Sequence, residues 1–270
     1  GDAGVPAQSG RRHRVTISRR SWIGGAAAFS GLLAAGRSVA QTAAATRRIY
    51  ANPLRTPADV AGFVMEGEAR VDFDTGRMRL KNARSAADGQ ASNFVYWCPE
   101  SFPDDVEFRW NFWPLEEPGL CILLFAAQGL LPGGARVSVL DKRLKPRAGV
   151  YAQYTNSDVS ALTMAYFRRR WPTERAFHLC NLRRAPGFQM LAQGPDPLPD
   201  VADASPPYRM RLQKRSDGVD FFMNDLPVMS WAQKPEHTGG EGWPAGGGVG
   251  FRQMAPLVAA YSDFEVWKLG

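Results

Sequence analysis

The sequence predicts an all-β protein, a jelly-roll β-sandwich of two antiparallel sheets. Three observations support this fold class. Helix signals are scarce, short segments with alternating apolar and polar residues recur, and residues of turn type separate them. About 230 residues remain after an N-terminal leader, which suits one all-β domain. Many antiparallel strands at this spacing are typical of a jelly roll.

The first predicted elements are a hairpin and two long strands. Residues 69–73 and 77–80 form the hairpin around the turn Asp74-Thr75-Gly76. Residues 106–113 alternate, so Val106, Phe108, Trp110 and Phe112 face inward while Glu107, Arg109 and Asn111 face outward. Residues 119–127 are continuously apolar, which predicts a central strand that is covered on both faces.

The C-terminal half repeats this pattern of short strands. The predicted strands are residues 208–214, 219–223, 226–231, 248–252 and 261–269, with turns at 216–218 and 224–225. Residues 195–207 and 234–248 are rich in proline or glycine and are predicted to be surface loops.

The N-terminus reads as an export signal. Arg19 and Arg20 precede a short apolar run at residues 23–35, and Ser38-Val39-Ala40 supplies the small residues of a cleavage site. We therefore expect a twin-arginine signal peptide at 1–40 and a single β-sandwich domain at 41–270. The apolar run is too short to span a bilayer, so we expect no membrane anchor after cleavage. The mature protein is expected to be periplasmic or secreted.

Removal of this leader changes the charge of the chain. The full sequence carries a formal charge of +7, but residues 1–40 hold six arginines and one aspartate. The rest is close to neutral, and nucleic acid is therefore not an expected partner. Cys98, Cys121 and Cys180 have bulky apolar neighbours, and we expect them to be buried free thiols.

Several segments carry a family resemblance. They are Tyr166–Arg169, Glu174–Arg183, Gly187-Phe188, Ala192–Gly194 and Gly250–Leu257. With them, residues 52–269 resemble the YesU-like family of unknown function within the concanavalin A-like lectin/glucanase sandwiches. The resemblance implies a sandwich with a concave face, and it implies an acidic plant-type glycan as the partner. It implies no established activity.

The segment from Tyr166 to Arg184 holds the candidate site. A strand over residues 161–170 would place Tyr166, Arg168 and Arg170 on one face. Guanidinium groups bind carboxylates in a bidentate way, and an aromatic ring packs on a sugar face. We expect an oligo- or polysaccharide with uronate residues as the ligand. The alternative is a solvated strand on which arginines cover aromatic rings.

Further candidates lie in the segments of the resemblance. Arg183, Asn181, Arg252 and Gln253 are expected to bind substrate together with Arg168 and Arg170. His178, Tyr166 and Glu174 are the catalytic candidates, because β-elimination of a uronate needs a base once arginine has neutralised the carboxylate. His178 could equally be a core histidine, and Glu174 the ion partner of Arg170 or Arg175.

Two other functions remain open at this stage. A glycoside hydrolase would need two carboxyl groups beside the bond, and the acid motif of the sandwich glucanases is absent. A non-catalytic carbohydrate-binding protein would need only the aromatic and arginine residues. The sequence implies no certain cofactor. A structural calcium ion with Asp263 or Asn224 among its ligands is an expectation.

Overall fold

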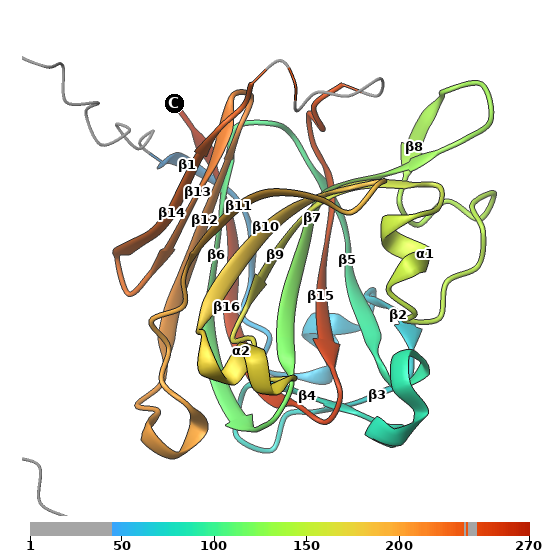
Figure 1. The fold of residues 1–270 in the computed structure, drawn as a ribbon. Helices are drawn as coiled ribbons and strands as arrows, with labels where there is room; N and C mark the ends of the chain where they lie inside the picture. Colours follow the sequence, from blue (N-terminus) through green and yellow to red (C-terminus); the bar gives the residue numbers. More distant parts are fainter. Residues whose placement is uncertain (1–44, 235, 237–241) are drawn as a thin grey trace, which may run out of the picture. The chain divides into compact units, whose positions relative to one another are not determined.

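The computed structural model describes residues 45–234, 236 and 242–270. The expected signal peptide at residues 1–40 lies outside them. Two antiparallel sheets of eight strands each, sheet A and sheet B, pack face to face (Figure 1). The predicted all-β jelly-roll sandwich is therefore confirmed.

Sheet A contains eight strands, among them the first and the last strand of the chain. These are β1 (Ala45–Asn52), β3 (Ala69–Asp72), β4 (Met78–Asn82), β6 (Val106–Glu116), β12 (Tyr208–Arg215), β13 (Gly218–Met223), β14 (Leu226–Ala232) and β16 (Val258–Leu269). The strand order is β14–β13–β12–β6–β16–β4–β3, and β1 also pairs with β16. The predicted hairpin of β3 and β4 turns through Gly76, whose φ of 66° suits glycine.

Sheet B contains the remaining strands. These are β2 (Val64–Gly67), β5 (Phe94–Phe102), β7 (Leu120–Leu130), β8 (Arg136–Ser138), β9 (Val159–Tyr166), β10 (Leu179–Ala185), β11 (Gln189–Pro195) and β15 (Gly247–Met254). The strand order is β11–β10–β9–β7–β15–β5–β2, and β8 pairs with β7. β7 is central, as its apolar run predicts.

The helices are short and lie in the connections. They are α1 (Ala152–Thr155), α2 (Pro172–Ala176) and the 3-10 turns η1 (Pro57–Val60), η2 (Ala86–Ser92) and η3 (Val201–Asp203). α1 packs on β9 and β10. None of the described helices is long and apolar enough to cross a membrane.

The main core fills the space between the sheets. In β6, the side chains of Val106, Phe108, Trp110 and Phe112 are buried there, as their alternation predicts. Each large apolar side chain buried in this way contributes about 1.5–3 kcal/mol. Glu107 was expected to be solvent-facing, but it is only 1% exposed because neighbouring polar side chains cover its carboxylate.

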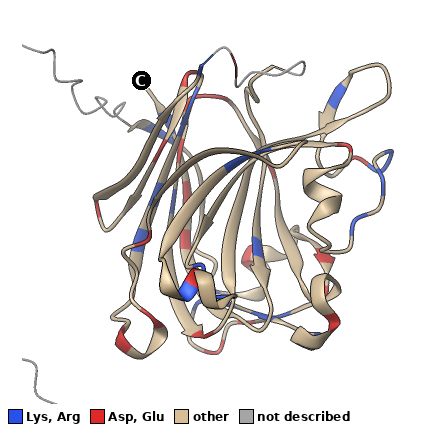
Figure 2. Ribbon diagram, in the orientation of Figure 1, with Lys and Arg blue, Asp and Glu red and all other residues tan. Residues whose placement is uncertain are grey.

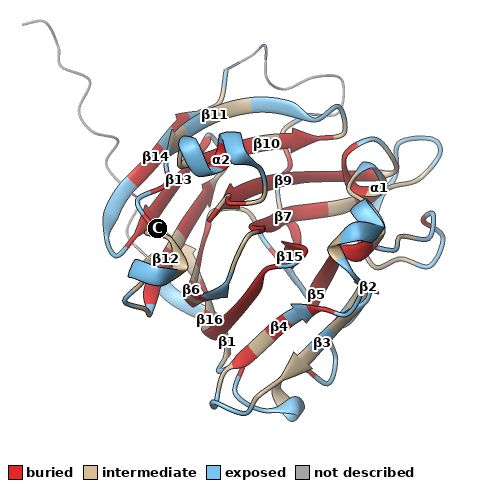
Figure 3. Ribbon diagram, turned by 60° about the horizontal axis from the view of Figure 1, so that its bottom comes forward, coloured by how far each residue is buried: buried red, intermediate tan, exposed pale blue. Residues whose placement is uncertain are grey.

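A smaller apolar cluster covers the outer face of sheet B, the face turned away from sheet A. Ile122 and Leu124 of β7 pack there against Trp97 of β5 and Tyr154 of α1. β9 and β15 are buried along their whole length (Figure 3). The loop that carries α1 thus forms a wall over this face.

The structure tests two further predictions, the state of the cysteines and the length of one strand. The three cysteines are buried and free, as predicted. The strand expected over residues 161–170 is wrong at its end, because β9 stops at Tyr166. Phe167 has φ 45°, in the left-handed region, and the chain leaves the sheet there. The alternation therefore does not continue to Arg168 and Arg170.

Candidate functional site

A pocket opens on the outer face of sheet B, and we call it the sheet B pocket. Its volume is about 140 Å³. Its floor is apolar and comes from alternate residues of three adjacent strands, namely Leu120, Ile122, Ala165 and Met254. The walls are polar or aromatic: Gln90, Tyr151, Arg168, Trp171, Glu174, Asn181, Arg183 and Phe188.

The alternation of β10 brings Asn181 and Arg183 into this pocket. Their neighbours Cys180 and Leu182 point into the core between the sheets, so these two side chains point outward. Asn181 lies opposite Ala165 and Arg183 lies opposite Thr163 of β9. Both were predicted as binding residues, and the structure places both in the pocket wall.

Arg168 and Glu174 form an ion pair at the edge of the pocket. Arg168 Nη2 donates to Glu174 Oε1 at 2.7 Å, and Glu174 Oε2 accepts from the backbone amides of Arg170 and Trp171 at 3.0 and 3.2 Å. Glu174 is thus an ion partner that caps the start of α2, and its partner is Arg168 instead of Arg170 or Arg175. Figure 2 shows acidic and basic residues side by side on α2.

Arg183 lies over an aromatic ring. Its guanidinium carbon is 3.9 Å from the centre of the Phe188 ring, and Nη1 donates to the Phe188 carbonyl oxygen at 3.3 Å. Phe188 in turn contacts Tyr151 edge-on, with 5.5 Å between ring centres. Burial lowers the pKa of Arg183, and the nearby charge of Arg168 lowers it further.

Arg252 of β15 lies behind the pocket wall. It is fully buried, and it donates to the Gly149 carbonyl oxygen at 2.6 Å and to Gln90 Oε1 at 3.3 Å. Gly149 has φ 84°, and a Cβ there would lie 1.9 Å from Asn93 O, so glycine is required to present this carbonyl. Among the described residues, no carboxylate forms an ion pair with Arg252.

Tyr151 is the residue that connects these arginines. Burial raises the pKa of its hydroxyl, while the charges of Arg252, Arg183 and Arg168 and a hydrogen bond with Thr163 oppose that rise. Sequence reasoning missed Tyr151, because it lies in an irregular stretch with no periodic signal. It also missed Trp171, Gln90 and Phe188. Of these, Phe188 could have been found, because it lies in a segment of the family resemblance.

Two predicted site residues are part of the core instead. Tyr166 is 1% exposed, and its ring lies 5.2 Å from that of Phe112 between the sheets. Burial raises its pKa well above the usual value. Gln253 is also fully buried, where it donates to the Leu80 carbonyl oxygen and accepts from Tyr261. The predicted catalytic role of Tyr166 and the predicted binding role of Gln253 are wrong, because neither side chain reaches solvent.

His178 and Arg170 lie near the pocket but do not line it. His178 precedes β10 and is 31% exposed, with Nε2 3.5 Å from Asp200 Oδ1. The guanidinium of Arg170 lies 6.0 Å from the ring centre of Trp171. The structure therefore brings together Arg168, Asn181, Arg183 and Glu174, but not His178 and Arg170.

Arg169 explains part of the arginine density in this segment. It is fully buried and pairs with Asp196 at 3.1 Å and Asp200 at 2.7 Å, and it also donates to the Leu198 carbonyl oxygen at 2.7 Å. These contacts hold the proline-rich loop that was predicted over residues 195–207. Arg169 thus has a structural role.

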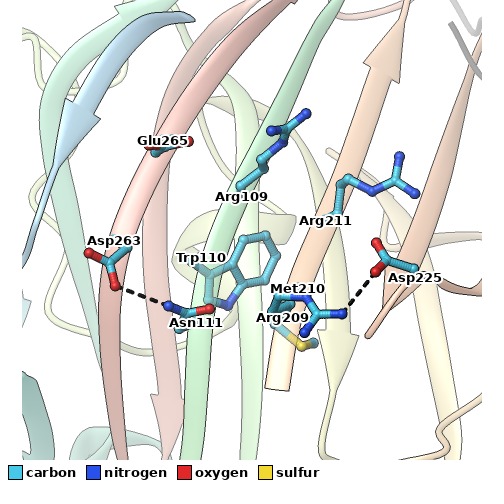
Figure 4. A pocket seen from close by; sticks show the side chains of 9 residues that line it. All are labelled: Arg109, Trp110, Asn111, Arg209, Met210, Arg211, Asp225, Asp263 and Glu265. Atoms are coloured by element: carbon cyan, nitrogen blue, oxygen red, sulfur yellow. Dashed lines mark hydrogen bonds and ion pairs between the residues drawn. The ribbon is translucent and has the colours of Figure 1, made fainter. Parts of the chain in front are cut away.

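A second pocket lies on the outer face of sheet A (Figure 4), and we call it the sheet A pocket. Its volume is about 490 Å³. It is lined by Arg109, Trp110, Asn111, Arg209, Met210, Arg211, Asp225, Asp263 and Glu265. None of these residues belongs to the sheet B pocket.

The oxygens of the two expected calcium ligands have protein partners. Asp263 accepts from Arg55 at 2.8 Å and from Asn111 at 3.0 Å, and Asn224 Oδ1 accepts from the Arg209 amide at 2.8 Å. Within the described part of the chain, no three or more His, Cys, Asp or Glu side chains gather in a way that could hold a metal ion. The calcium ion remains a prediction.

The two packed eight-stranded sheets define a lectin-like β-sandwich of the galectin and concanavalin A type. The chain belongs to the family described as domain of unknown function DUF1961, which matches residues 47–266. It is 43% identical over 220 residues to the uncharacterized protein YesU of Bacillus subtilis (strain 168). The aligned region covers 81% of this chain and 94% of that relative. The family resemblance seen in the sequence is confirmed.

Solved structures agree with this assignment. A Bacillus subtilis protein of unknown function with a galectin-like fold superposes with a TM-score of 0.78 at 42% identity, over 84% of this chain and 98% of that chain. The potassium-bound carbohydrate recognition domain of Emp46p superposes with a TM-score of 0.53 at 9% identity, over 83% of this chain and 97% of that chain. The laminarinase from Rhodothermus marinus superposes with a TM-score of 0.52 at 9% identity, over 83% of this chain and 98% of that chain. The last two show a shared fold.

Proposed function

We propose that this protein binds an acidic oligosaccharide, one that contains uronate residues, in the sheet B pocket. The arginines around Tyr151 support this proposal most strongly: Arg168 and Arg183 line the pocket together with Tyr151, and the guanidinium carbon of Arg252 lies 4.8 Å from the centre of the Tyr151 ring. Glu174 is the one carboxylate among the lining residues, and it pairs with Arg168. A carboxylate of the ligand would supply the missing negative charge, and a guanidinium can bind it with two parallel hydrogen bonds.

The rest of the pocket suits a sugar ring. Trp171 and Phe188 are 45% and 41% exposed and stand in the wall above the apolar floor. Exposed aromatic rings of this kind can pack against the C–H face of a sugar, while Asn181 and Gln90 can hydrogen-bond its hydroxyl groups. Two proteins that share the fold, a carbohydrate recognition domain and a laminarinase, are named for carbohydrates, which agrees with a glycan ligand.

β-Elimination is a second candidate function at the same site, and Tyr151 favours it. The Tyr151 phenolate, the minor form because burial raises the pKa of this hydroxyl, would accept the C5 proton of a uronate while Arg168 and Arg183 neutralise its carboxylate. The C4–O bond then breaks, the electron pair forms the C4=C5 double bond, and the phenol returns the proton to the leaving oxygen. Tyr151 replaces Tyr166 and His178 in this role, because it alone of the three lines the pocket.

Hydrolysis has less support from the pocket. Glycosidases of the common type use two carboxyl groups beside the scissile bond. Glu174 is the one carboxylate among the lining residues, and both of its oxygens already accept hydrogen bonds. A retaining or inverting pair is therefore not assembled by the residues of this pocket.

A panel of defined glycans tests the proposed function. Calorimetry compares oligogalacturonate and glucuronan fragments with neutral galactan and laminarin fragments of equal length. We expect binding of the acidic fragments alone, weakened by salt. Ultraviolet absorbance of an unsaturated uronate reports elimination, and new reducing ends without that absorbance report hydrolysis. A preference for the neutral fragments would contradict the proposal.

We also propose that the protein works outside the cytoplasm, after twin-arginine export. The paired arginines, the short apolar run and the small residues before Gln41 support this location. A periplasmic or extracellular protein would meet such polysaccharide fragments directly.

A further inference from the structure

Two arginines that line the sheet A pocket share one buried carboxylate. Glu107 is 1% exposed, and its Oε1 accepts from Arg109 Nε at 2.5 Å. Its Oε2 accepts from Arg211 Nη1 at 3.1 Å and from Gln213 Nε2 at 2.6 Å. Arg109 and Arg211 lie directly opposite each other on β6 and β12. One carboxylate thus holds two guanidinium groups, and the carboxylates of Asp225, Asp263 and Glu265 also line the pocket.

Aromatic rings fix the orientation of both guanidinium groups. The guanidinium carbon of Arg109 lies 4.6 Å from the ring centre of Trp267, and that of Arg211 lies 3.8 Å from the ring centre of Phe222. Within the described residues, both Nη atoms of Arg109 and the Nε and Nη2 atoms of Arg211 make no hydrogen bond to the protein. These donors are held in place and are available to an anion.

Carboxylates and an amide lie among the arginines of this pocket. Asn111 Nδ2 donates to Asp263 at 3.0 Å, and Arg209 pairs with Asp225 at 2.8 Å (Figure 4). Asp263 has φ 53° at an irregularity in the pairing of β16 with β6, which turns it toward Asn111. Guanidinium donors that are unpaired in the described part of the chain, together with carboxylate and amide groups, suit a ligand with both an anionic group and hydroxyl groups.

We propose that the sheet A pocket is a second binding site for a uronate sugar. Its carboxylate would lie on Arg109 and Arg211, and its hydroxyl groups on Asn111 and Asp263. The inference shares its ligand class with the proposed function but rests on separate residues. The two pockets lie on the opposite outer faces of the sandwich, so a long polysaccharide, or two chains, could be held at both. Such bivalent binding raises the apparent affinity for polymers above that for short fragments.

Calorimetry with a short oligogalacturonate on the full protein tests this site. We expect two equivalents bound by the unchanged protein. Arg211→Ala should remove one equivalent or weaken it at least ~10-fold, and Arg183→Ala should remove the other. Asn111→Ala should weaken the same equivalent as Arg211→Ala, and it leaves the Glu107 contacts intact. Arg70→Ala on β3 is the matched control, because Arg70 is an exposed arginine outside both pockets.

The outcomes separate this inference from the proposed function. One equivalent that is lost in Arg183→Ala and kept in Arg211→Ala overturns the second site while the proposed function stands. One equivalent that is lost in Arg211→Ala and kept in Arg183→Ala supports binding in the sheet A pocket and contradicts binding in the sheet B pocket. Absence of uronate binding to the unchanged protein overturns both. If inorganic sulfate displaces the oligosaccharide from the sheet A pocket at equal concentration, the site is a general anion site and the sugar assignment is wrong.

Discussion

The guanidinium carbon of Arg252 lies 4.8 Å from the centre of the Tyr151 ring, and Arg252 is fully buried. Its hydrogen bonds go to a carbonyl and an amide oxygen, and its Nε is left without a partner. A buried charge without a counter-ion is costly, so it usually has a function. Here it lies behind a pocket that two further arginines line, which is the arrangement expected for an anionic ligand.

Arg183 is expected to contribute most of the direct binding of a uronate. Arg183→Ala should weaken oligogalacturonate binding about 10- to 100-fold, since a charge-assisted hydrogen bond contributes about 1.5–3 kcal/mol. Calorimetry at low and high salt measures the change, and the salt dependence should decrease in the variant. Arg70→Ala serves as the control and should bind like the unchanged protein. Equal binding by Arg183→Ala in the sheet B pocket would exclude this role.

Replacement of Arg252 should separate stability from binding. Arg252→Met removes the uncompensated charge but keeps much of the volume, so the free energy of unfolding should change by less than about 2 kcal/mol. The affinity for acidic fragments should still fall by about 10-fold, because the field behind Tyr151 is lost. Urea unfolding and calorimetry give the two quantities. A strongly destabilised variant with unchanged affinity would show that Arg252 is purely structural.

Tyr151 is expected to carry any elimination activity. Tyr151→Phe keeps the ring contacts with Phe188 and Arg252 but removes the ionisable hydroxyl. Binding of acidic fragments should remain within about 3-fold, and formation of the unsaturated uronate should cease. His178→Ala should leave the rate unchanged, since His178 lies outside the pocket lining. Turnover that survives Tyr151→Phe and is lost in His178→Ala would reverse the assignment.

Stability should fall at alkaline pH because of the buried thiols. Burial raises the pKa of the Cys121 thiol from 9.0 to about 12, and burial also raises the pKa of Cys180 and Cys98. The unfolded chain releases these protons above about pH 9, while the folded protein keeps the Cys121 proton up to about pH 12 and holds those of Cys180 and Cys98 to a higher pH than the unfolded chain does. The free energy of unfolding should therefore be unaffected by these groups below pH 9 and decrease above it.

Urea unfolding between pH 7.5 and 10.5 checks this decrease. Cys121→Ala should reduce the slope above pH 9, because it removes one of the titrating groups. A thiol reagent should react with the folded protein at pH 8 only after urea is added, since the three cysteines are buried. Rapid reaction of the folded protein, or an unchanged slope in Cys121→Ala, would contradict the explanation.

Export should depend on the paired arginines. Replacement of both Arg19 and Arg20 by lysine should leave the precursor in the cytoplasm, because the twin-arginine pathway reads this pair. Fractionation followed by immunoblotting measures the location, and mass spectrometry should place the new N-terminus at Gln41. Arg11→Lys with Arg12→Lys is the matched control, as that pair lies further from the apolar run. Normal export of the Arg19 and Arg20 variant would remove the twin-arginine interpretation.

The sequence alone determined the fold class and many of the strands of this protein. Period-two alternation is a local property, since successive side chains of a strand point to opposite faces. It correctly placed Phe108 and Trp110 in the core, and the continuous apolar run correctly placed β7 at the centre of a sheet. Asn181 and Arg183, predicted as binding residues from the family resemblance, both line the sheet B pocket.

The tertiary structure decided which chemical groups meet. Phe167 takes a left-handed conformation and ends β9, which puts Tyr166 in the core and Arg168 at the pocket edge. Tyr151 and Arg252 come from a loop and a strand about a hundred residues apart, and only the order of strands in sheet B brings them together. Pairing between distant strands depends on how the whole sheet packs, so no local pattern could place that contact.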